Sequence, residues 1–306
     1  MRKPIGTTVL LGIALMGSLW LVRESSLGAR AAWAADRVTH AAFSLTERLF
    51  HRDDGAAHRV VYEYRSAERP SAEAREGQEG PFEWSGRVDR GDRVAVVGLN
   101  GKITASASDG PEVEVRAVRT SRHGDVADVR VEVREHSGGI TVCAIYDNWD
   151  GCEDGSRRGR VRNGDVQVQF DIRVPEGVEF SASTVNGGVE VTGGIDAVDV
   201  SAVNGSVEVE SLGRLNASSV NGSVRAHLMA DALSGPVHVS TVNGAVELDL
   251  PDGADADVDA SWVNGSFASD LPVTLHSKGK RNARGQLGSG GERVQVETVN
   301  GRIRIH

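Results

Sequence analysis

Apolar and polar residues alternate with a period of two through the second half of the chain. Val198, Val200 and Ala202 alternate with polar residues, and Val207 and Val209 do so again a few positions later. A repeat of about 180° per residue that is rich in valine indicates half-buried β-strands. The pattern therefore predicts a succession of short strands from residue 178 to residue 306.

A Val-Asn-Gly tripeptide interrupts these strands at intervals. Its asparagines are 18, 17, 22, 21 and 36 residues apart, and a period near twenty residues is typical of repeat architectures in which each unit packs on the next. Leu99-Asn100-Gly101 is an earlier relative of the same tripeptide. The six corners are Asn186-Gly187, Asn204-Gly205, Asn221-Gly222, Asn243-Gly244, Asn264-Gly265 and Asn300-Gly301.

Two all-β folds can be built from this unit. Asn-Gly between alternating strands favours hairpins, because both residues tolerate the positive φ of a type I′ turn, and hairpins would give an antiparallel meander or sandwich. Six identical corners instead indicate corners that touch each other. This would occur in a β-solenoid, where coils stack about 4.8 Å apart and asparagine amides form a ladder. We predict the β-solenoid, with the meander as the alternative.

Residues 82–306 are expected to form one β-repeat domain with two parts. In residues 82–177 the alternating segments are longer and are joined by glycine-rich or charged turns, which predict hairpins. We expect this part to close the first edge of the array formed by residues 178–306, because an exposed terminal coil would pair with other chains. The core should be thin, since the chain has 37 glycines and only 5% aromatic residues.

The first 34 residues have the pattern of an export signal. Arg2 and Lys3 precede an apolar run, and Ala32-Trp33-Ala34 presents small residues where a signal peptidase cuts. Charged residues between the run and that position leave an uncleaved N-terminal anchor as the alternative. Residues 35–81 are expected to contain a short helix and a flexible linker. We therefore predict an exported protein of the periplasm, the cell surface or the medium.

The charge and the cysteines narrow the choice of partners and sites. A formal charge of −9 argues against general binding to nucleic acid or to anionic lipid, so membrane contact is expected only through an uncleaved leader. Cys143 and Cys152 are the only cysteines, and in an exported protein such a pair predicts a disulfide. The acidic residues Asp147, Asp150, Glu153 and Asp154 do not follow the order of an EF-hand loop, and no metal site is expected.

A glycine-rich basic segment lies in the long interval between the last two corners. Its basic residues are His276, Lys278, Lys280, Arg281 and Arg284. A flexible surface loop is the expected structure of such a segment. The alternative is a contact for an anionic envelope polymer or another partner.

The chain resembles the bacterial putative adhesin family, a group of β-repeat domains of unknown function. The resemblance covers about residues 82–306 and rests on the Val-Asn-Gly array, on Phe82-Glu83-Trp84-Ser85-Gly86 and on the segment Asp171-Ile172-Arg173-Val174-Pro175-Glu176-Gly177. It implies a solenoid-like exported protein without an established enzymatic activity. No functional residue is carried over from the family.

No constellation of reactive residues stands out in the sequence. The histidines are scattered, and His-Glu-x-x-His, Gly-x-Ser-x-Gly and P-loop motifs do not occur. We therefore predict neither catalytic residues nor a cofactor. The main hypothesis is a non-enzymatic envelope scaffold that presents a repetitive β face to a protein or a polysaccharide. The alternatives are a membrane-tethered periplasmic sensory or regulatory module and a β-helical enzyme acting on polysaccharides.

Overall fold

The computed structural model describes residues 80–122, 125–146, 152, 165–230 and 232–306. The predicted leader and most of the predicted helix and linker lie outside these residues. The described chain is almost entirely β-structure, with one short 3₁₀ turn, η1 (Val126–Asp128). The strands are β1 (Phe82–Gly86), β2 (Arg93–Val97), β3 (Ile103–Ser108), β4 (Val113–Thr120), β5 (Val129–His136), β6 (Gly139–Tyr146), β7 (Gln167–Pro175), β8 (Glu179–Asn186), β9 (Val189–Asn204), β10 (Val207–Asn221), β11 (Val224–Leu228), β12 (Val237–Asn243), β13 (Val246–Asp249), β14 (Ala256–Ser269), β15 (Thr274–Lys278), β16 (Asn282–Leu287) and β17 (Glu292–Ile305).

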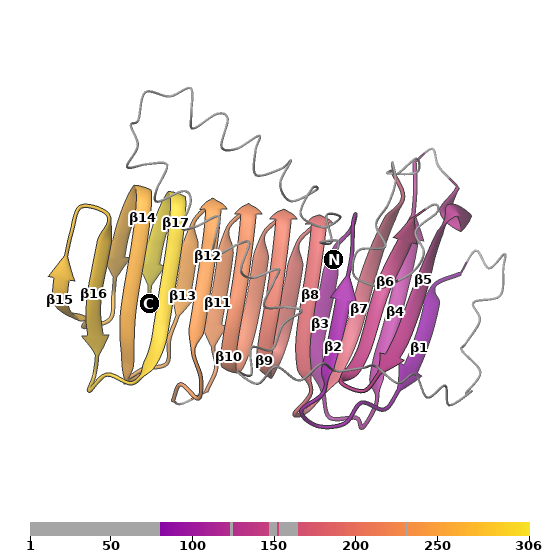
Figure 1. Ribbon diagram of the computed structural model, residues 1–306, viewed down its shortest axis with the longest axis horizontal. Coiled ribbons are helices and arrows are strands. Elements are labelled where there is room, and N and C mark those ends of the chain that lie inside the picture. The colour runs from indigo at the N-terminus through magenta and orange to yellow at the C-terminus, as the bar shows by residue number, and fades with distance from the viewer. Residues whose placement is uncertain (1–79, 123–124, 147–151, 153–164, 231) are drawn as a thin grey trace, which may run out of the picture.

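The strands form the stacked coils of a β-solenoid, as predicted (Figure 1). Each coil has one strand before an Asn-Gly corner and one strand after it. Strand β9 completes one coil and begins the next: its first half pairs with β3 and its second half pairs with β8, in both cases in parallel. The corners therefore join successive sides of a coil, and the antiparallel meander is wrong for the array.

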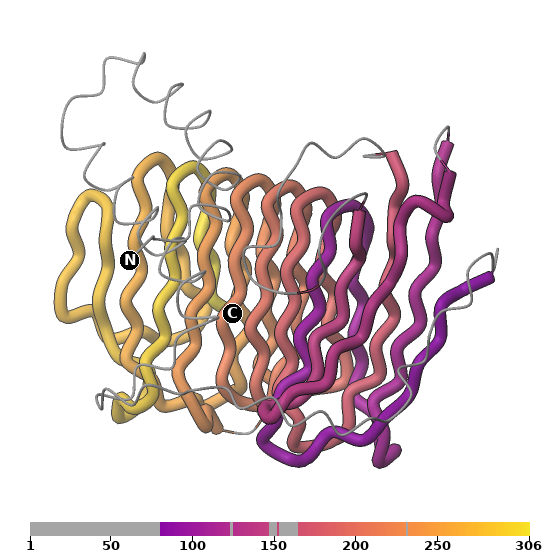
Figure 2. Tube along the Cα trace, turned by 45° about the vertical axis from the view of Figure 1, so that its right-hand side comes forward, coloured from indigo at the N-terminus to yellow at the C-terminus, as the bar shows by residue number. Residues whose placement is uncertain are grey.

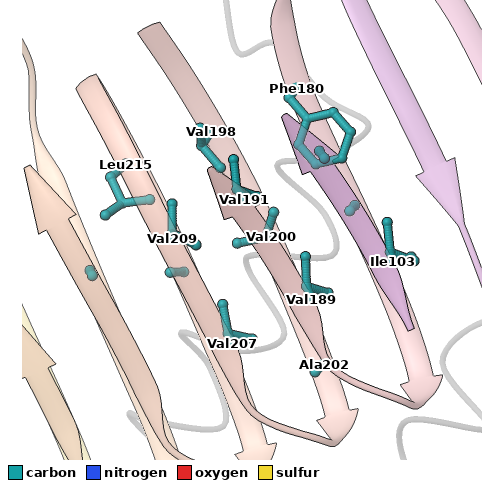
Figure 3. Packing of buried hydrophobic residues seen from close by; sticks show 14 of the residues in the cluster. Ile103, Phe180, Val189, Val191, Val198, Val200, Ala202, Val207, Val209 and Leu215 are labelled. Atoms are coloured by element: carbon teal, nitrogen blue, oxygen red, sulfur yellow. The ribbon is translucent and has the colours of Figure 1, made fainter. Parts of the chain in front are cut away.

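Two parallel faces enclose the core (Figure 2). We call the strands that precede a corner the first face and the strands that follow a corner the second face. Val198 and Val200 point inward from the first face, and Val189 and Val191 point inward from the second face (Figure 3). Each valine buried in this way contributes about 2 kcal/mol, so the stability of a coil depends on the coils that cover it.

The spatial order of the coils differs from their order along the chain. Strand β17 lies between earlier strands: it pairs with β12 and β13 on one side and with β14 on the other. The coil of β2 and β3 is likewise flanked by β8 and β9 on one side and by β6 and β7 on the other. The corner asparagines therefore stack in the order Asn100, Asn186, Asn204, Asn221, Asn243, Asn300 and Asn264.

Antiparallel strands cover both ends of the stack. At one end β1 pairs with β4, β4 pairs with β7, and β5 pairs with β6. At the other end β16 pairs with β14 and β15 pairs with β16, so the first face extends two strands beyond the second face. In this last coil Trp262 stacks on Phe267, with ring centroids 5.9 Å apart, and the two rings close the end of the core.

Close contact between coils explains why every corner contains glycine. Of the seven corner glycines only Gly101 has a positive φ, of 124°, so the turn conformation does not require glycine at the other six. A Cβ atom on Gly205 would instead lie 2.0 Å from the carbonyl oxygen of Gly187, and one on Gly222 would lie 2.1 Å from that of Gly205. The backbone of the neighbouring coil occupies the space that any side chain would need.

Candidate binding surfaces

The corner asparagines form a continuous hydrogen-bonded ladder along one edge of the solenoid. The Nδ2 group of each asparagine donates to the Oδ1 atom of the preceding one, at 2.8 or 2.9 Å. The bonds run from Asn186 to Asn100, Asn204 to Asn186, Asn221 to Asn204, Asn243 to Asn221, Asn300 to Asn243 and Asn264 to Asn300. Asn100 is buried, Asn300 is half-buried and the other five side chains are exposed, but the amides of all seven are engaged with each other. The ladder is therefore a structural edge.

A second ladder inside the corners was not anticipated from the sequence. The Oγ1 atom of Thr241 donates to the carbonyl oxygen of Gly222 at 2.7 Å, and the Oγ atom of Ser219 donates to that of Gly205 at 2.8 Å. Thr184 and Thr298 make the equivalent bonds to Gly101 and Gly244. The signal was present, because a hydroxyl residue stands two positions before four of the corner asparagines. These hydroxyls give the carbonyl oxygens of four corner glycines a hydrogen-bond partner from the neighbouring coil.

The second face presents charged side chains that pair across the coils. The guanidinium of Arg225 lies between two carboxylates, 2.8 Å from an oxygen of Glu208 and 2.9 Å from one of Glu247. Hydrogen bonding and the negative charge, first of Glu247 and then of Glu208, raise the pKa of Arg225 above its ordinary value. Lys102 pairs with Glu190 in the same manner. Because these pairs are solvent-exposed, they order the surface but add little stability.

The first face carries short polar side chains in straight rows. Ser183, Ser201, Ser218 and Ser240 occupy equivalent positions on four successive coils. A neighbouring row contains Ser181, Asp199, Asn216 and His238, in register with each other. Ser181 and Ser240 are buried and the other side chains of the two rows are half-buried, so the middle of this face is flat and rich in hydroxyl groups but little exposed.

Among the described residues of the first face, Asp199 has a carboxyl group with a shifted pKa. It accepts a 3.0 Å hydrogen bond from Asn216 Nδ2. Burial raises the pKa of Asp199 to about 6, although the positive charge of Arg93, the Asn216 bond and the charge of Arg214 oppose the rise. Both arginines also pair with Glu179 at 3.0 Å, which limits the charge available to Asp199.

Replacing Asp199 with asparagine is expected to stabilise the protein at neutral pH. A carboxyl whose pKa is higher in the folded state than in the unfolded state favours folding only while it is protonated. Its stabilising effect is complete below about pH 4 and is lost as the pH rises to about 6. We expect Asp199→Asn to raise the free energy of unfolding by about 1 to 2 kcal/mol at pH 7 and by little at pH 4. Urea unfolding of both proteins across this range tests the prediction, and a constant difference would contradict it.

The basic segment forms a β-hairpin, β15–β16, instead of the expected flexible loop. Its strands pair in register from Thr274 with Gln286 to Lys278 with Ala283, with one irregularity. Arg284 is tied to Asp259, with 3.1 Å between Nε and Oδ2, and His276 lies 3.0 Å from the side-chain oxygen of Gln286. Lys278, Lys280 and Arg281 are exposed, and none of the three forms a salt bridge with another described residue.

These three cations lie at one end of a molecule whose charge is unevenly distributed. Residues 179–270 contain fourteen acidic and two basic side chains, whereas residues 271–306 contain seven basic and two acidic side chains. Strand β15 is the outermost strand at the end opposite β1 (Figure 1). The hairpin is therefore the basic end of a largely acidic body, and electrostatic attraction for an anion is concentrated there.

The two cysteines are joined as predicted. Cys143 and Cys152 form a disulfide with their Cα atoms 5.7 Å apart. Cys143 is buried in β6, so the bond links this strand to the segment that follows it. The disulfide is thus part of the strands that cover the first end of the stack.

The described residues contain neither a cluster of metal-ligating side chains nor a helix suited to a membrane. No three or more His, Cys, Asp or Glu side chains in that part of the chain are arranged to hold a metal ion. No helix among the same residues has the length and hydrophobicity needed to cross a membrane.

Comparisons with known proteins place the chain in a family. Three solved structures are similar to it. A putative cell adhesion protein of Clostridium sporogenes has a TM-score of 0.44 and 13% sequence identity, and the match covers 74% of this chain and 99% of that chain. A putative adhesin of Bacteroides fragilis has a TM-score of 0.33 and 15% identity, with 75% of this chain and 98% of that chain covered. A putative adhesin of Parabacteroides merdae has a TM-score of 0.30 and 9% identity, with 74% of this chain and 96% of that chain covered. No curated protein matches the chain. The model of the family called Toastrack DUF4097 matches residues 124–306, and the chain belongs to that family.

Proposed function

We propose that the protein is an exported, non-enzymatic binding scaffold of the cell envelope. The observation that supports this most directly is the register of the coils, which repeats the same outward positions at each step along two faces. A surface of this kind offers many weak, equivalent contacts to a long partner. The export pattern of residues 1–34 supports a location outside the cytoplasm.

The arrangement of charged groups favours binding over catalysis. Acid and base catalysis needs two groups held near a substrate with their pKa values driven apart. The carboxylates of the second face instead lie beside cations in exposed pairs, as Glu208 and Glu247 do beside Arg225. Asp199 has a raised pKa, but the hydrogen bond that it accepts comes from the amide of Asn216, which does not titrate. The surface therefore offers recognition chemistry without an evident acid–base pair.

Binding through the basic hairpin at one end would orient the scaffold relative to its partner. Lys278, Lys280 and Arg281 are free to contact an anionic envelope polymer, whereas the excess of acidic residues in the segment 179–270 disfavours binding of such a polymer elsewhere along the body. Binding through the hairpin would leave the long axis pointing away from the polymer. The two faces would then remain open to a second partner.

Neutralising the three hairpin cations tests this function. We expect Lys278→Gln, Lys280→Gln and Arg281→Gln together to weaken binding to a soluble acidic polysaccharide such as alginate by about tenfold, because three exposed charges contribute about 0.5 kcal/mol each. The matched control replaces Arg116, Arg173 and Arg225 with glutamine, which removes the same charge from strands β4, β7 and β11, outside the hairpin. An equal loss of affinity in the two variants would exclude the proposed contact. So would a failure of the unmodified protein to bind both alginate and isolated cell envelopes.

A further inference from the structure

The Asn-Gly sequence of the corners is prone to a spontaneous chemical reaction. An asparagine followed by glycine can deamidate spontaneously, because a glycine nitrogen without a neighbouring side chain readily reaches the side-chain amide carbon. The chain contains eight Asn-Gly pairs, of which Asn163-Gly164 lies outside the described residues. The stacking of the coils decides which of the other seven can react.

Inside the stack both reacting groups are held by neighbouring coils. The backbone N–H groups of five corner glycines donate to the carbonyl oxygen of the next asparagine in the stack, at 2.8 to 3.1 Å. These bonds run from Gly101 to Asn186, Gly187 to Asn204, Gly205 to Asn221, Gly222 to Asn243 and Gly244 to Asn300. The asparagine side chains of these inner coils are held from both sides by the amide ladder. Deamidation there would require a coil to open.

The bonds all run in one direction, and this leaves the last corner unprotected. Asn264 and Gly265 are in register with Asn300 and Gly301, and no further coil follows them among the residues that the structure describes. On the open side β16 pairs with β14 only as far as Ser261, and the next bond, from Trp262 to Arg281, is the last one described there. The N–H of Gly265, directed like those of the other corners, therefore points past the stack. Gly265 is exposed, whereas the other six corner glycines are half-buried.

The opposite end of the stack lacks this weakness. Asn100 is only 8% exposed. The N–H of Gly101 donates to Asn186, and the carbonyl oxygen of Asn100 accepts a 2.8 Å bond from the N–H of Val168. The first corner is therefore held from both sides, and the polarity of the ladder makes its two ends chemically different.

We propose that Asn264 is a site of spontaneous deamidation in the folded protein. The nitrogen of Gly265 loses its proton and bonds to Cγ of Asn264, the bond from Cγ to Nδ2 breaks, and ammonia leaves carrying the proton. Water then adds to one carbonyl of the resulting cyclic imide and opens it to aspartate or isoaspartate. The net change replaces ammonia with water and needs no oxidant or reductant.

The product would open the last rung of the ladder. Asn264 donates from Nδ2 to Oδ1 of Asn300 at 2.9 Å. A carboxylate at position 264 has no proton to donate, so a carboxylate oxygen would face the Oδ1 atom of Asn300. The two oxygens repel each other, so β14 loses a contact with β17 at the corner. In the isoaspartate product an additional backbone atom also disturbs the register of this edge.

Peptide mapping by mass spectrometry tests the site. The full chain is incubated in mildly alkaline buffer, and the gain of about 1 Da at each corner is followed with time. We expect Asn264 to react at least about ten times faster than Asn221 and Asn300 in the folded protein, and the three to react at similar rates in urea. Equal rates in the folded protein, or an Asn264 rate as slow as that of Asn221, would overturn the proposal.

A pair of variants tests the effect on the ladder. Asn264→Asp supplies the product directly, and Asn264→Gln is the matched control that keeps an amide of similar polarity. We expect the aspartate variant to have the lower melting temperature at neutral pH and the difference to shrink in acid, where the carboxyl is protonated and can donate. Equal melting temperatures at neutral pH would contradict the opening of the last rung.

Discussion

Replacing Gly222 with alanine is expected to destabilise the domain by about 3 kcal/mol or more. The added Cβ atom would lie 2.1 Å from the carbonyl oxygen of Gly205 and 2.5 Å from its carbonyl carbon. Both are backbone atoms of the neighbouring coil, so no side chain can turn away to make room. The coils must separate locally, which also stretches the asparagine and backbone hydrogen bonds that cross this corner.

Two other glycines provide the controls for this substitution. Gly253 has a φ of 80° and nothing within 4 Å of an added Cβ, so its replacement should cost only the conformational preference, about 1 kcal/mol. Gly80 also has nothing within 4 Å of an added Cβ and has no positive φ, so its replacement should hardly change the free energy of unfolding. Urea unfolding of the three alanine variants measures the differences. A Gly222 variant no less stable than the Gly253 variant would contradict the close contact between coils.

Removing the disulfide is expected to lower the free energy of unfolding by about 2 to 3 kcal/mol. Cys143 and Cys152 are nine residues apart, and closing a loop of this length restricts the unfolded chain by about that amount. The double variant Cys143→Ala, Cys152→Ala is the suitable test, because Cys143 is 4% exposed and a serine hydroxyl would be buried there.

Reduction of the unmodified protein provides an independent measurement of the same effect. Dithiothreitol should move its urea midpoint to that of the double alanine variant and leave the variant unchanged. A midpoint that does not respond to the reductant in the unmodified protein would show that the bond contributes nothing to stability. The result also bears on the proposed exported location, where such a bond persists.

The strands and the stacking of the array could be predicted from local patterns. Alternating valines define inward positions whichever way a strand pairs, and repeated identical corners indicate contact between corners. The reason for glycine could not be inferred in the same way. Asn-Gly suits both a hairpin with positive φ and a coil with a backbone carbonyl close by, and only the position of the next coil distinguishes Gly222 from a turn residue.

Other features of the surfaces depend on neighbours that are distant in sequence. The raised pKa of Asp199 reflects burial and the positions of Arg93 and Asn216, which come from two other strands. The glycine-rich, basic composition of residues 276–285 predicts a flexible surface loop. The segment forms a hairpin because β14 offers a free edge with which β16 pairs. Sequence spacing alone reveals neither arrangement.

The placement of β17 between β13 and β14 has a consequence for the order in which the molecule can assemble. Residues 256–287 emerge from the ribosome, and cross any membrane, before the strand that joins them to the rest of the body exists. Until residues 292–305 arrive, β14 has no partner on that side, and the stack ends at β12 and β13 with an open edge. The growing chain therefore has two unpaired strand edges, at which it can pair with other copies of itself before β17 fills the gap between them.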